Sequence, residues 1–356
     1  MGRARATRGA GSSPRGVALC WIAMLLLGSG CELRSTRRAA PSYPQAGAYP
    51  PGAYPPGAYP PGAYPPGAYP PGAPPPGAHP PGPYPPGTNA PSAPAAPPVA
   101  AAPGSLVRWQ AVPPTNGDVN LTWGPTLTDI TQHTPLRDKR DWGDFGGTGH
   151  ELTHAISFEL RLVASRSSPA RSVNGFYVLG GQAALMKEPQ GFKKSQVAGL
   201  VPPSLRQSRF GDYMSGQIGW DAQPLYVWDE WNAYINGATV AVERYQIGLA
   251  PHTTFATTDT VFAVLEFTIY ALAVIHAAQQ YEPAYLTREP QAREFFAYNA
   301  RRAMALVKRG RDLPPFKWSK LNLLEATLRS APEAEPLRAS ARSVFGPGWA
   351  REVFGF

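Results

Sequence analysis

The chain has 356 residues, of which 43 are proline, 36 are glycine and two are cysteine. Its formal net charge is +9 at pH 7, and four uncompensated arginines in the first 15 residues account for part of it, which leaves +5. This mildly basic balance argues against an obligate nucleic-acid-binding protein. It is compatible with attraction to anionic envelope polymers or lipid headgroups.

The N-terminus combines a charged start with an apolar run, the pattern of a secretory signal. The run GVALCWIAMLLLG, residues 16–28, is too short for a comfortable membrane span. It continues into GSGC and resembles the cleavage site of bacterial lipoproteins, although Gly28 stands where that family usually has a branched apolar residue. The resemblance implies a lipoprotein signal peptide at residues 1–30 and a lipid on Cys31. The chain would then be exported and lipid-anchored to a bacterial membrane in the cell envelope.

Cleavage before Cys31 would remove Cys20, the other cysteine, so the mature chain would have no disulfide. The folded domain must then rely on a hydrophobic core, for which the roughly 250 residues after the linker suffice. Thiolate ligands are also excluded. We therefore expect any metal to be bound by His, Asp or Glu.

Residues 31–104 are expected to form the lipidated N-terminus and a disordered linker rich in proline, tyrosine and glycine. Between residues 43 and 87 the pentapeptide GAYPP repeats. Proline at two of every five positions removes backbone donors and fixes φ, so neither a helix nor a strand ladder forms. We interpret the repeat as a stalk that holds a domain away from its membrane. The alternative is that its tyrosines dock onto a partner surface or a wall polymer.

Residues 105–356 are expected to form one folded domain, mainly α with small β elements (α+β). Its first part is irregular with possible short strands, and NGFYVLGGQAALM, residues 174–186, predicts one strand or a hairpin. Helical patterns separated by proline fill the rest. They cover residues 148–165, 227–245, 259–280, 290–308, 321–330 and 335–344.

The segment 259–280 is apolar enough to raise the question of a membrane span. It contains Glu266 and His276, and no clear positive cluster flanks it on one side. A carboxylate at mid-span is expensive in lipid, whereas a central helix of a globular domain is apolar all round. We therefore predict a buried core helix.

The strongest chemical signal is GGTGHELTH, residues 146–154. On an α-helix His150 and His154 lie on one face and present two imidazole nitrogens to one ion, about 2.0–2.1 Å away for zinc. Glu151 falls beside the metal, where its carboxylate can take a proton from water that attacks a carbonyl. The H-E-x-x-H pattern therefore predicts a Zn²⁺ site with Glu151 as the general base.

The same residues allow a second interpretation. Thr148 and Glu151 form T-x-x-E, the capping-box pattern, so Glu151 could fold back on the start of the helix. His150 would then lie on the surface and His154 would be half buried.

A catalytic zinc needs a third protein ligand. No third histidine follows His154 at the metzincin spacing, and the better candidate is Glu230 in VWDEWNAYINGA, on the predicted helix 227–245. Together HELTH and EWNAYINGA resemble the gluzincin metallopeptidases, in which a glutamate on a later helix completes the site and an alanine three residues on allows close packing. Ala233 matches this pattern, while Tyr234 stands where many of those enzymes have an acidic residue.

The resemblance covers two short motifs, about a tenth of the folded domain. It implies a zincin-like domain, in which the H-E-x-x-H helix and a second, glutamate-bearing helix hold one Zn²⁺. Its ligands would be His150, His154 and Glu230, with Glu151 as the general base.

Other residues remain candidates for parts of this site. Asp229 could be the ligand in place of Glu230, or could orient a ligand histidine. Glu266 is a further candidate for the third ligand, while a lone histidine among alanines, such as His276, is usually a core residue. An oxyanion could be stabilised by a hydroxyl or an imidazole. The candidates are Tyr234, our first choice, together with Tyr226, Tyr213 and His252.

The segment REFFAYNARRAMALVKRGR interleaves arginine and lysine with an apolar stripe. Such a face is usually solvated, and the alternative is contact with lipid headgroups or anionic sugars of the envelope.

These observations favour a membrane-tethered zinc metallopeptidase that acts on a peptide or protein substrate in the cell envelope. The alternative is a noncatalytic surface lipoprotein, a binding or structural module that retains a zincin-like fold. In a third interpretation, the stalk itself is the functional part.

Overall fold

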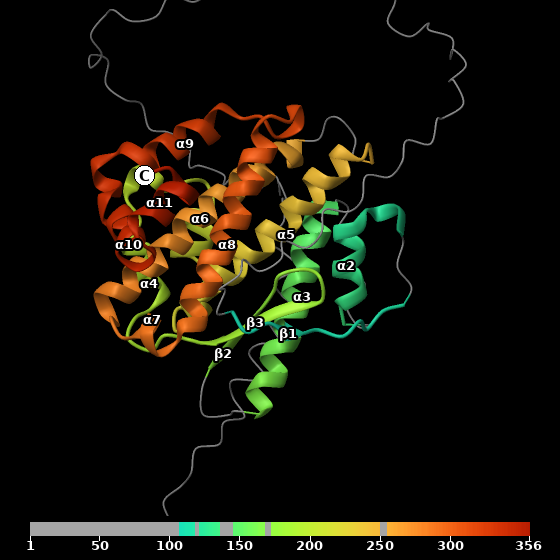
Figure 1. Cartoon of the computed structure of the whole chain (residues 1–356), viewed down its shortest axis with the longest axis horizontal. Helices are drawn as coiled ribbons and strands as arrows, with labels where there is room; N and C mark the ends of the chain where they lie inside the picture. The colour runs from blue at the N-terminus through green and yellow to red at the C-terminus, as the bar shows by residue number, and fades with distance from the viewer. Residues whose placement is uncertain (1–106, 118–120, 136–144, 168–171, 250–254) are drawn as a thin grey trace, which may run out of the picture. The chain divides into compact units, whose positions relative to one another are not determined.

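The computed structural model describes residues 107–117, 121–135, 145–167, 172–249 and 255–356, which are the coloured parts of Figure 1. The expected signal peptide, the lipid site Cys31 and the proline-rich linker lie outside the described residues, as does His252. The described residues all belong to one unit of the chain, Gly87–Phe356.

The described part is mainly helical, as the sequence predicts. Its α-helices are α2 (Pro125–His133), α3 (Phe145–Ser167), α4 (Lys194–Leu200), α5 (Tyr226–Gln246), α6 (Phe255–Tyr281), α7 (Tyr285–Arg288), α8 (Pro290–Arg311), α9 (Ser319–Ser330), α10 (Glu335–Phe345) and α11 (Pro347–Phe354). Short 3₁₀ turns are η2 (Leu121–Trp123), η3 (Pro203–Leu205), η5 (Ile218–Trp220), η6 (Pro314–Phe316) and η7 (Pro332–Ala334), and η4 (Phe210–Ser215) is a π-helical turn.

A small antiparallel sheet accompanies the helices, with strand order β1-β3-β2. The strands are β1 (Gln110–Ala111), β2 (Val173–Tyr177) and β3 (Gln182–Lys187). Strands β2 and β3 form the expected hairpin, in which Phe176 pairs with Ala184. Strand β2 packs against α3, so the sheet supports the helix that carries HELTH.

Helix α6 is the centre of the core. Its apolar stretch Thr260–Tyr281 is long and apolar enough to cross a membrane by length and composition, yet 94% of its most apolar 18-residue window is buried inside the fold. It packs against α4, α5, α8, α9 and α10, which surround it in Figure 1. The prediction of a buried core helix is confirmed.

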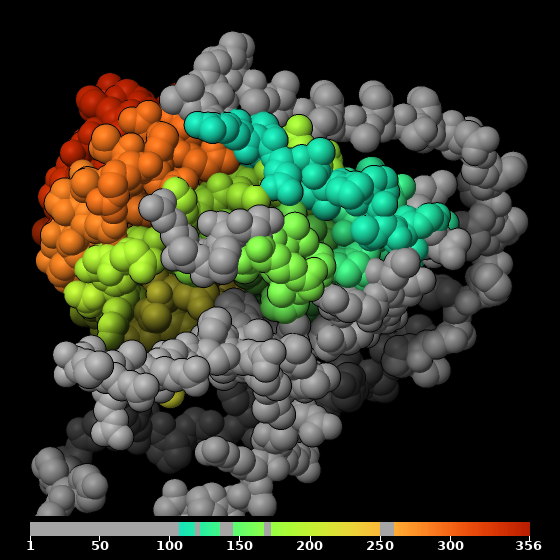
Figure 2. Space-filling model, turned by 90° about the horizontal axis from the view of Figure 1, so that it is seen from below, coloured from blue at the N-terminus to red at the C-terminus, as the bar shows by residue number. Residues whose placement is uncertain are grey.

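Helix α3 has one face that packs in the core and another that carries the two histidines of HELTH. Leu152, Ile156 and Leu160 recur every four residues and are buried against α2, the hairpin and α5. Burying each such side chain contributes about 1.5–3 kcal/mol. His150 and His154 recur at the same spacing on another stripe, which faces α5. Figure 2 shows the α3 surface in green beside the teal surface of the β1–α2 region.

Two glycines allow α3 and α5 to cross closely. A Cβ atom on Gly237 would lie 2.6 Å from the Gly146 carbonyl oxygen and 3.1 Å from the His150 Cβ. A Cβ atom on Gly149 would lie 2.9 Å from a methyl carbon of Val240. Any larger residue at either position would therefore push the two helices apart.

Several basic residues of α8 contact other side chains of the fold. Arg301 pairs with Glu352 at 3.1 Å, and Arg293 pairs with its neighbour Glu294 at 2.8 Å. Arg302 lies among the buried polar side chains that join α8 to α5, where it donates to Asn236 at 2.7 Å. These contacts compete with the binding of an anionic surface by this helix.

Candidate metal centre

His150 and His154 bring their Nε2 atoms to 3.1 Å of one another. The two residues lie one turn apart on α3, and their side chains are 12% and 20% exposed. Two nitrogens bound to one zinc at about 2.0–2.1 Å, with tetrahedral angles, would lie about 3.3 Å apart. The histidine pair therefore already has the separation that a shared ion requires.

Glu230 completes this cluster from α5. Its Oε2 atom lies 3.6 Å from His150 Nε2 and 3.4 Å from His154 Nε2. This oxygen is buried and has no hydrogen-bond partner. A buried carboxylate oxygen without a donor is costly, and a cation would satisfy it. Among the described residues, the group that could hold a metal ion is His150, His154 and Glu230, whose ligand atoms all lie within 4.8 Å of one another.

Asp229 orients one of the histidines. Its Oδ2 atom accepts a hydrogen bond from His154 Nδ1 at 3.1 Å, which directs Nε2 of the same ring towards the cluster. Burial alone would raise the pKa of Asp229, but Arg161 and His154 hold it well below its usual value. Of the two roles that the sequence left open for Asp229, the structure favours the orienting one.

The surroundings shift the pKa values of the two histidines in opposite directions. Burial, followed by the proximity of His154, lowers the pKa of His150. Burial would also lower the pKa of His154, but Glu230 and Asp229 raise it well above the ordinary value. The carboxylates thus favour positive charge at His154, and a metal ion would compete with a proton for that position.

A chain of hydrogen bonds supports Asp229 from behind. Arg161, two turns after His154 on α3, donates to Asp229 Oδ2 at 2.9 Å and to Asn174 Oδ1 at 3.1 Å. Asn174 in turn donates to Glu188, which lies just after β3. Helix α3 and the hairpin therefore fix the orientation of His154 together.

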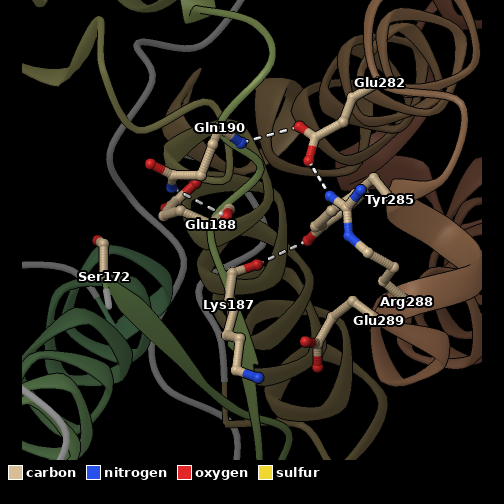
Figure 3. A pocket seen from close by; sticks show the side chains of 8 residues that line it. All are labelled: Ser172, Lys187, Glu188, Gln190, Glu282, Tyr285, Arg288 and Glu289. Atoms are coloured by element: carbon tan, nitrogen blue, oxygen red, sulfur yellow. Dashed lines mark hydrogen bonds and ion pairs between the residues drawn. The ribbon is translucent and has the colours of Figure 1, made fainter. Parts of the chain in front are cut away.

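Glu188 also borders a cavity of about 630 Å³ that is separate from the metal cluster and is shown in Figure 3. Burial raises the pKa of Glu188 to about 8. The lining is polar and includes Glu282, which accepts from the Gln190 backbone, and Tyr285, which donates to the Lys187 carbonyl. None of the candidate metal ligands lines this cavity.

Tyr234 lies directly beside the metal cluster, with its ring centroid 4.4 Å from that of His150. Its hydroxyl lies 3.1 Å from the Tyr213 hydroxyl and accepts a hydrogen bond from Arg209 Nε at 3.2 Å. Burial raises the pKa of Tyr234 to about 12, so its hydroxyl stays protonated at neutral pH. Two tyrosine hydroxyls and a guanidinium thus gather next to the candidate ligands.

Glu151 lies at the open side of the cluster. Its Oε1 atom is 4.0 Å from His150 Nε2, and its side chain is 35% exposed. It is not among the clustered ligands, which agrees with the role of a base beside the metal. Helix α3 begins at Phe145, three residues before Thr148, so Thr148 is not the N-cap and the capping-box interpretation is wrong.

The other candidates lie elsewhere. Glu266 does not join the histidines, because it binds Arg209 at 3.2 Å and accepts from Tyr270 at 2.7 Å. His276 lies half-buried on α6, 2.9 Å from the Ser340 hydroxyl. Tyr226 stacks on Trp220.

Sequence reasoning did not find Arg161 or Arg209. Arg161 follows His154 by seven residues and so shares its helical face, a spacing that could have indicated it. Arg209 precedes a short irregular segment whose pattern predicts no element, and no local signal marks it.

Three comparisons with known proteins found no match to this chain: no family model, no curated protein and no solved structure.

Replacing Asp229 with asparagine is expected to lower zinc affinity about 10–100-fold, the usual effect of losing a partner of a ligand histidine. The amide keeps the size of the side chain but removes the charge that Arg161 and His154 share. Competition with a chelating indicator measures the change. The matched control is Asp212→Asn, since Asp212 is exposed; equal affinities in the two variants would contradict the orienting role.

Proposed function

We propose that this chain is a zinc-dependent metallopeptidase with a zincin-like domain of the gluzincin type. The observation that carries the proposal is the convergence of the buried Oε2 atom of Glu230 on two imidazole nitrogens, those of His150 and His154. His150, His154 and Glu230 supply the two-histidine, one-glutamate ligand set that catalytic zinc uses in other peptidases. The sequence order H-E-x-x-H, then a glutamate on a later helix, supports the same assignment.

Each neighbouring side chain has a role in this proposal. A zinc ion bound by these residues would polarise a carbonyl and lower the pKa of a water molecule. Glu151, beside the ligands and partly exposed, accepts the proton of the attacking water and passes it to the leaving amine. Tyr234 or its partner Tyr213 donates a hydrogen bond to the developing oxyanion.

Arg209 strengthens that donor. It is held by the buried carboxylate of Glu266 and donates to the Tyr234 hydroxyl, so one hydrogen of the Tyr213–Tyr234 hydroxyl pair is left for a substrate oxygen. A cation beside the phenol also favours negative charge on a bound oxygen. This arrangement suits acyl transfer to water better than it suits a purely structural metal.

We further propose that the domain acts on peptides or proteins in the cell envelope, where the lipoprotein-like signal and the proline-rich stalk would tether it. No nucleic-acid partner is proposed, and contact with anionic envelope polymers is at most secondary.

The test is elemental analysis of the purified full chain together with peptide cleavage read by mass spectrometry. About one zinc ion per chain is expected, with cleavage that stops on chelation and returns when zinc is restored. A folded chain that holds no zinc and cleaves no peptide would favour the noncatalytic surface lipoprotein instead.

A further inference from the structure

Lys194, the first residue of α4, is a buried lysine with an unusual set of partners. Its side chain is among the largest that are fully buried, and the residue is 2% exposed. Its ammonium donates to the backbone carbonyls of Tyr213 at 2.9 Å, Met214 at 2.7 Å and Gly216 at 2.7 Å. Three carbonyls therefore replace the water that this charge loses on burial.

These carbonyls belong to the end of the π-helical turn η4. Gly216 N donates to the Gly211 carbonyl at 2.8 Å, which closes the wide turn. Carbonyls at the end of a helical turn lack partners within it, and Lys194 supplies three donors there. The turn starts just after Arg209 and contains Tyr213. Arg209 and Tyr213 both contact the hydroxyl of Tyr234, which lies beside the candidate metal ligands.

The start of α4 also holds the segment that follows this turn. The Lys194 backbone donates to the Asp221 carbonyl at 2.9 Å, and the Ser195 backbone donates to Asp221 Oδ1 at 2.8 Å. Gln217 lies between the carbonyls that bind the Lys194 ammonium and Asp221. Its φ is 49°, a left-handed conformation that is rare for a residue with a side chain. Such a conformation persists where surrounding contacts fix the backbone.

The opposite end of the turn has its own attachment. Glu266 accepts from the Arg209 backbone at 3.0 Å and from the Arg209 guanidinium at 3.2 Å. Glu266 lies on the buried helix α6 and is 0% exposed. The turn is thus fixed by a buried anion at its start and a buried cation at its end.

We infer that Lys194 is a positioning residue for the proposed peptidase site, because its buried ammonium fixes the end of the π-helical turn that holds Tyr213 against Tyr234. Only the expected effect of Lys194 on catalysis rests on the proposed function; its effect on the turn does not. Lys194 touches neither the candidate ligands nor the substrate, and it acts through Tyr213.

The test compares the full chain with its Lys194→Met variant, which keeps the apolar length and removes the ammonium. Hydrogen exchange read by mass spectrometry is expected to accelerate in residues 209–216 and to stay unchanged in α3 and α5. Zinc content should remain that of the wild type, while kcat falls about 10–100-fold, as expected when a catalytic group is displaced by about 1 Å. Lys193→Met is the matched control, since Lys193 is the exposed neighbour and should leave both readouts unchanged.

A double variant separates positioning from general destabilisation. If Lys194 acts through Tyr213, then adding Lys194→Met to Tyr213→Phe should cost less than about threefold in kcat beyond the Tyr213→Phe loss. If the kcat losses of the two single variants multiply fully in the double variant, the inference is overturned. Unchanged hydrogen exchange in residues 209–216 of the Lys194→Met chain would also overturn it. If Lys194→Met does not fold, Lys194→Gln keeps amide donors and serves in its place.

Failure of the proposed function gives a different result. A wild-type chain without zinc or cleavage would overturn the peptidase proposal, and the exchange comparison, which needs neither, would still decide whether Lys194 fixes the turn.

Discussion

Replacing Glu151 with glutamine is expected to lower kcat roughly 10²–10⁴-fold while the zinc ion stays bound. Glutamine keeps the size of the side chain but accepts no proton from water. Glu151 lies beside the ligand cluster and not in it, with Oε1 4.0 Å from His150 Nε2 and the side chain 35% exposed. Its loss should therefore remove the base without removing a ligand.

Kinetics and elemental analysis on the same preparation measure both parts of this result. Glu159→Gln, on the same helix, is the control and should retain both zinc and activity, because Glu159 lies eight residues after Glu151 and is not in the ligand cluster. Loss of zinc in the Glu151→Gln chain would show that Glu151 is a ligand, and full activity would show that it is not the base.

The second large effect is expected when a ligand itself is removed. Glu230→Ala and His154→Ala should each weaken zinc binding by more than the roughly 100-fold that loss of an outer partner can cause. Each change deletes one of the three atoms that converge in the cluster. Cleavage should then disappear at zinc concentrations that saturate the wild type.

Zinc titration of the purified chains tests this prediction. His276→Ala is the matched control, because that half-buried histidine contacts Ser340, is not in the ligand cluster and should not affect zinc. Wild-type zinc content in the Glu230→Ala chain would remove Glu230 from the site and reopen the question of the third ligand.

Much of the helical framework follows from the sequence because the elements have strong local patterns. The predicted segments 148–165 and 227–245 correspond to α3 and α5. Helix α3 extends three residues further at its start and two at its end, and α5 extends one residue further at each end. Helix α3 starts earlier than predicted, at Phe145, so Gly146, Gly147 and Gly149 lie in its first turns. Gly149 faces the crossing with α5.

Helix α2 was not predicted, and its stability is not local. Its sequence PTLTDITQH is rich in β-branched residues, and its N-cap Gly124 provides no side-chain hydrogen bond. Glu243 of α5 accepts instead from the Thr126 backbone at 3.0 Å and from its hydroxyl at 2.5 Å. A cap supplied by a distant helix leaves no trace in the local pattern.

The candidate site also combines residues that local sequence patterns predict with residues that only the fold brings together. The spacing of His150 and His154 is local, and Glu230 is named by a second motif. The choice between Asp229 and Glu230 needed coordinates, because adjacent residues differ by about 100° around a helix and only packing decides which faces the histidines. Lys194 and Arg209 act through backbone carbonyls and a buried counter-ion, contacts that no sequence spacing encodes.

The glycine crossing of α3 and α5 has a consequence for how such a site is lost in evolution. Gly149 directly precedes His150, and Gly237 lies two turns beyond Glu230, so the contact that packs the helices also sets the distance between the two halves of the ligand set. An alanine at either glycine would displace one half from the other without altering any ligand. Descendants of this chain could therefore keep the HELTH sequence and Glu230 unchanged and still have no metal site. The pair of glycines, read together with the motifs, is the better indicator of which descendants keep the geometry of this cluster.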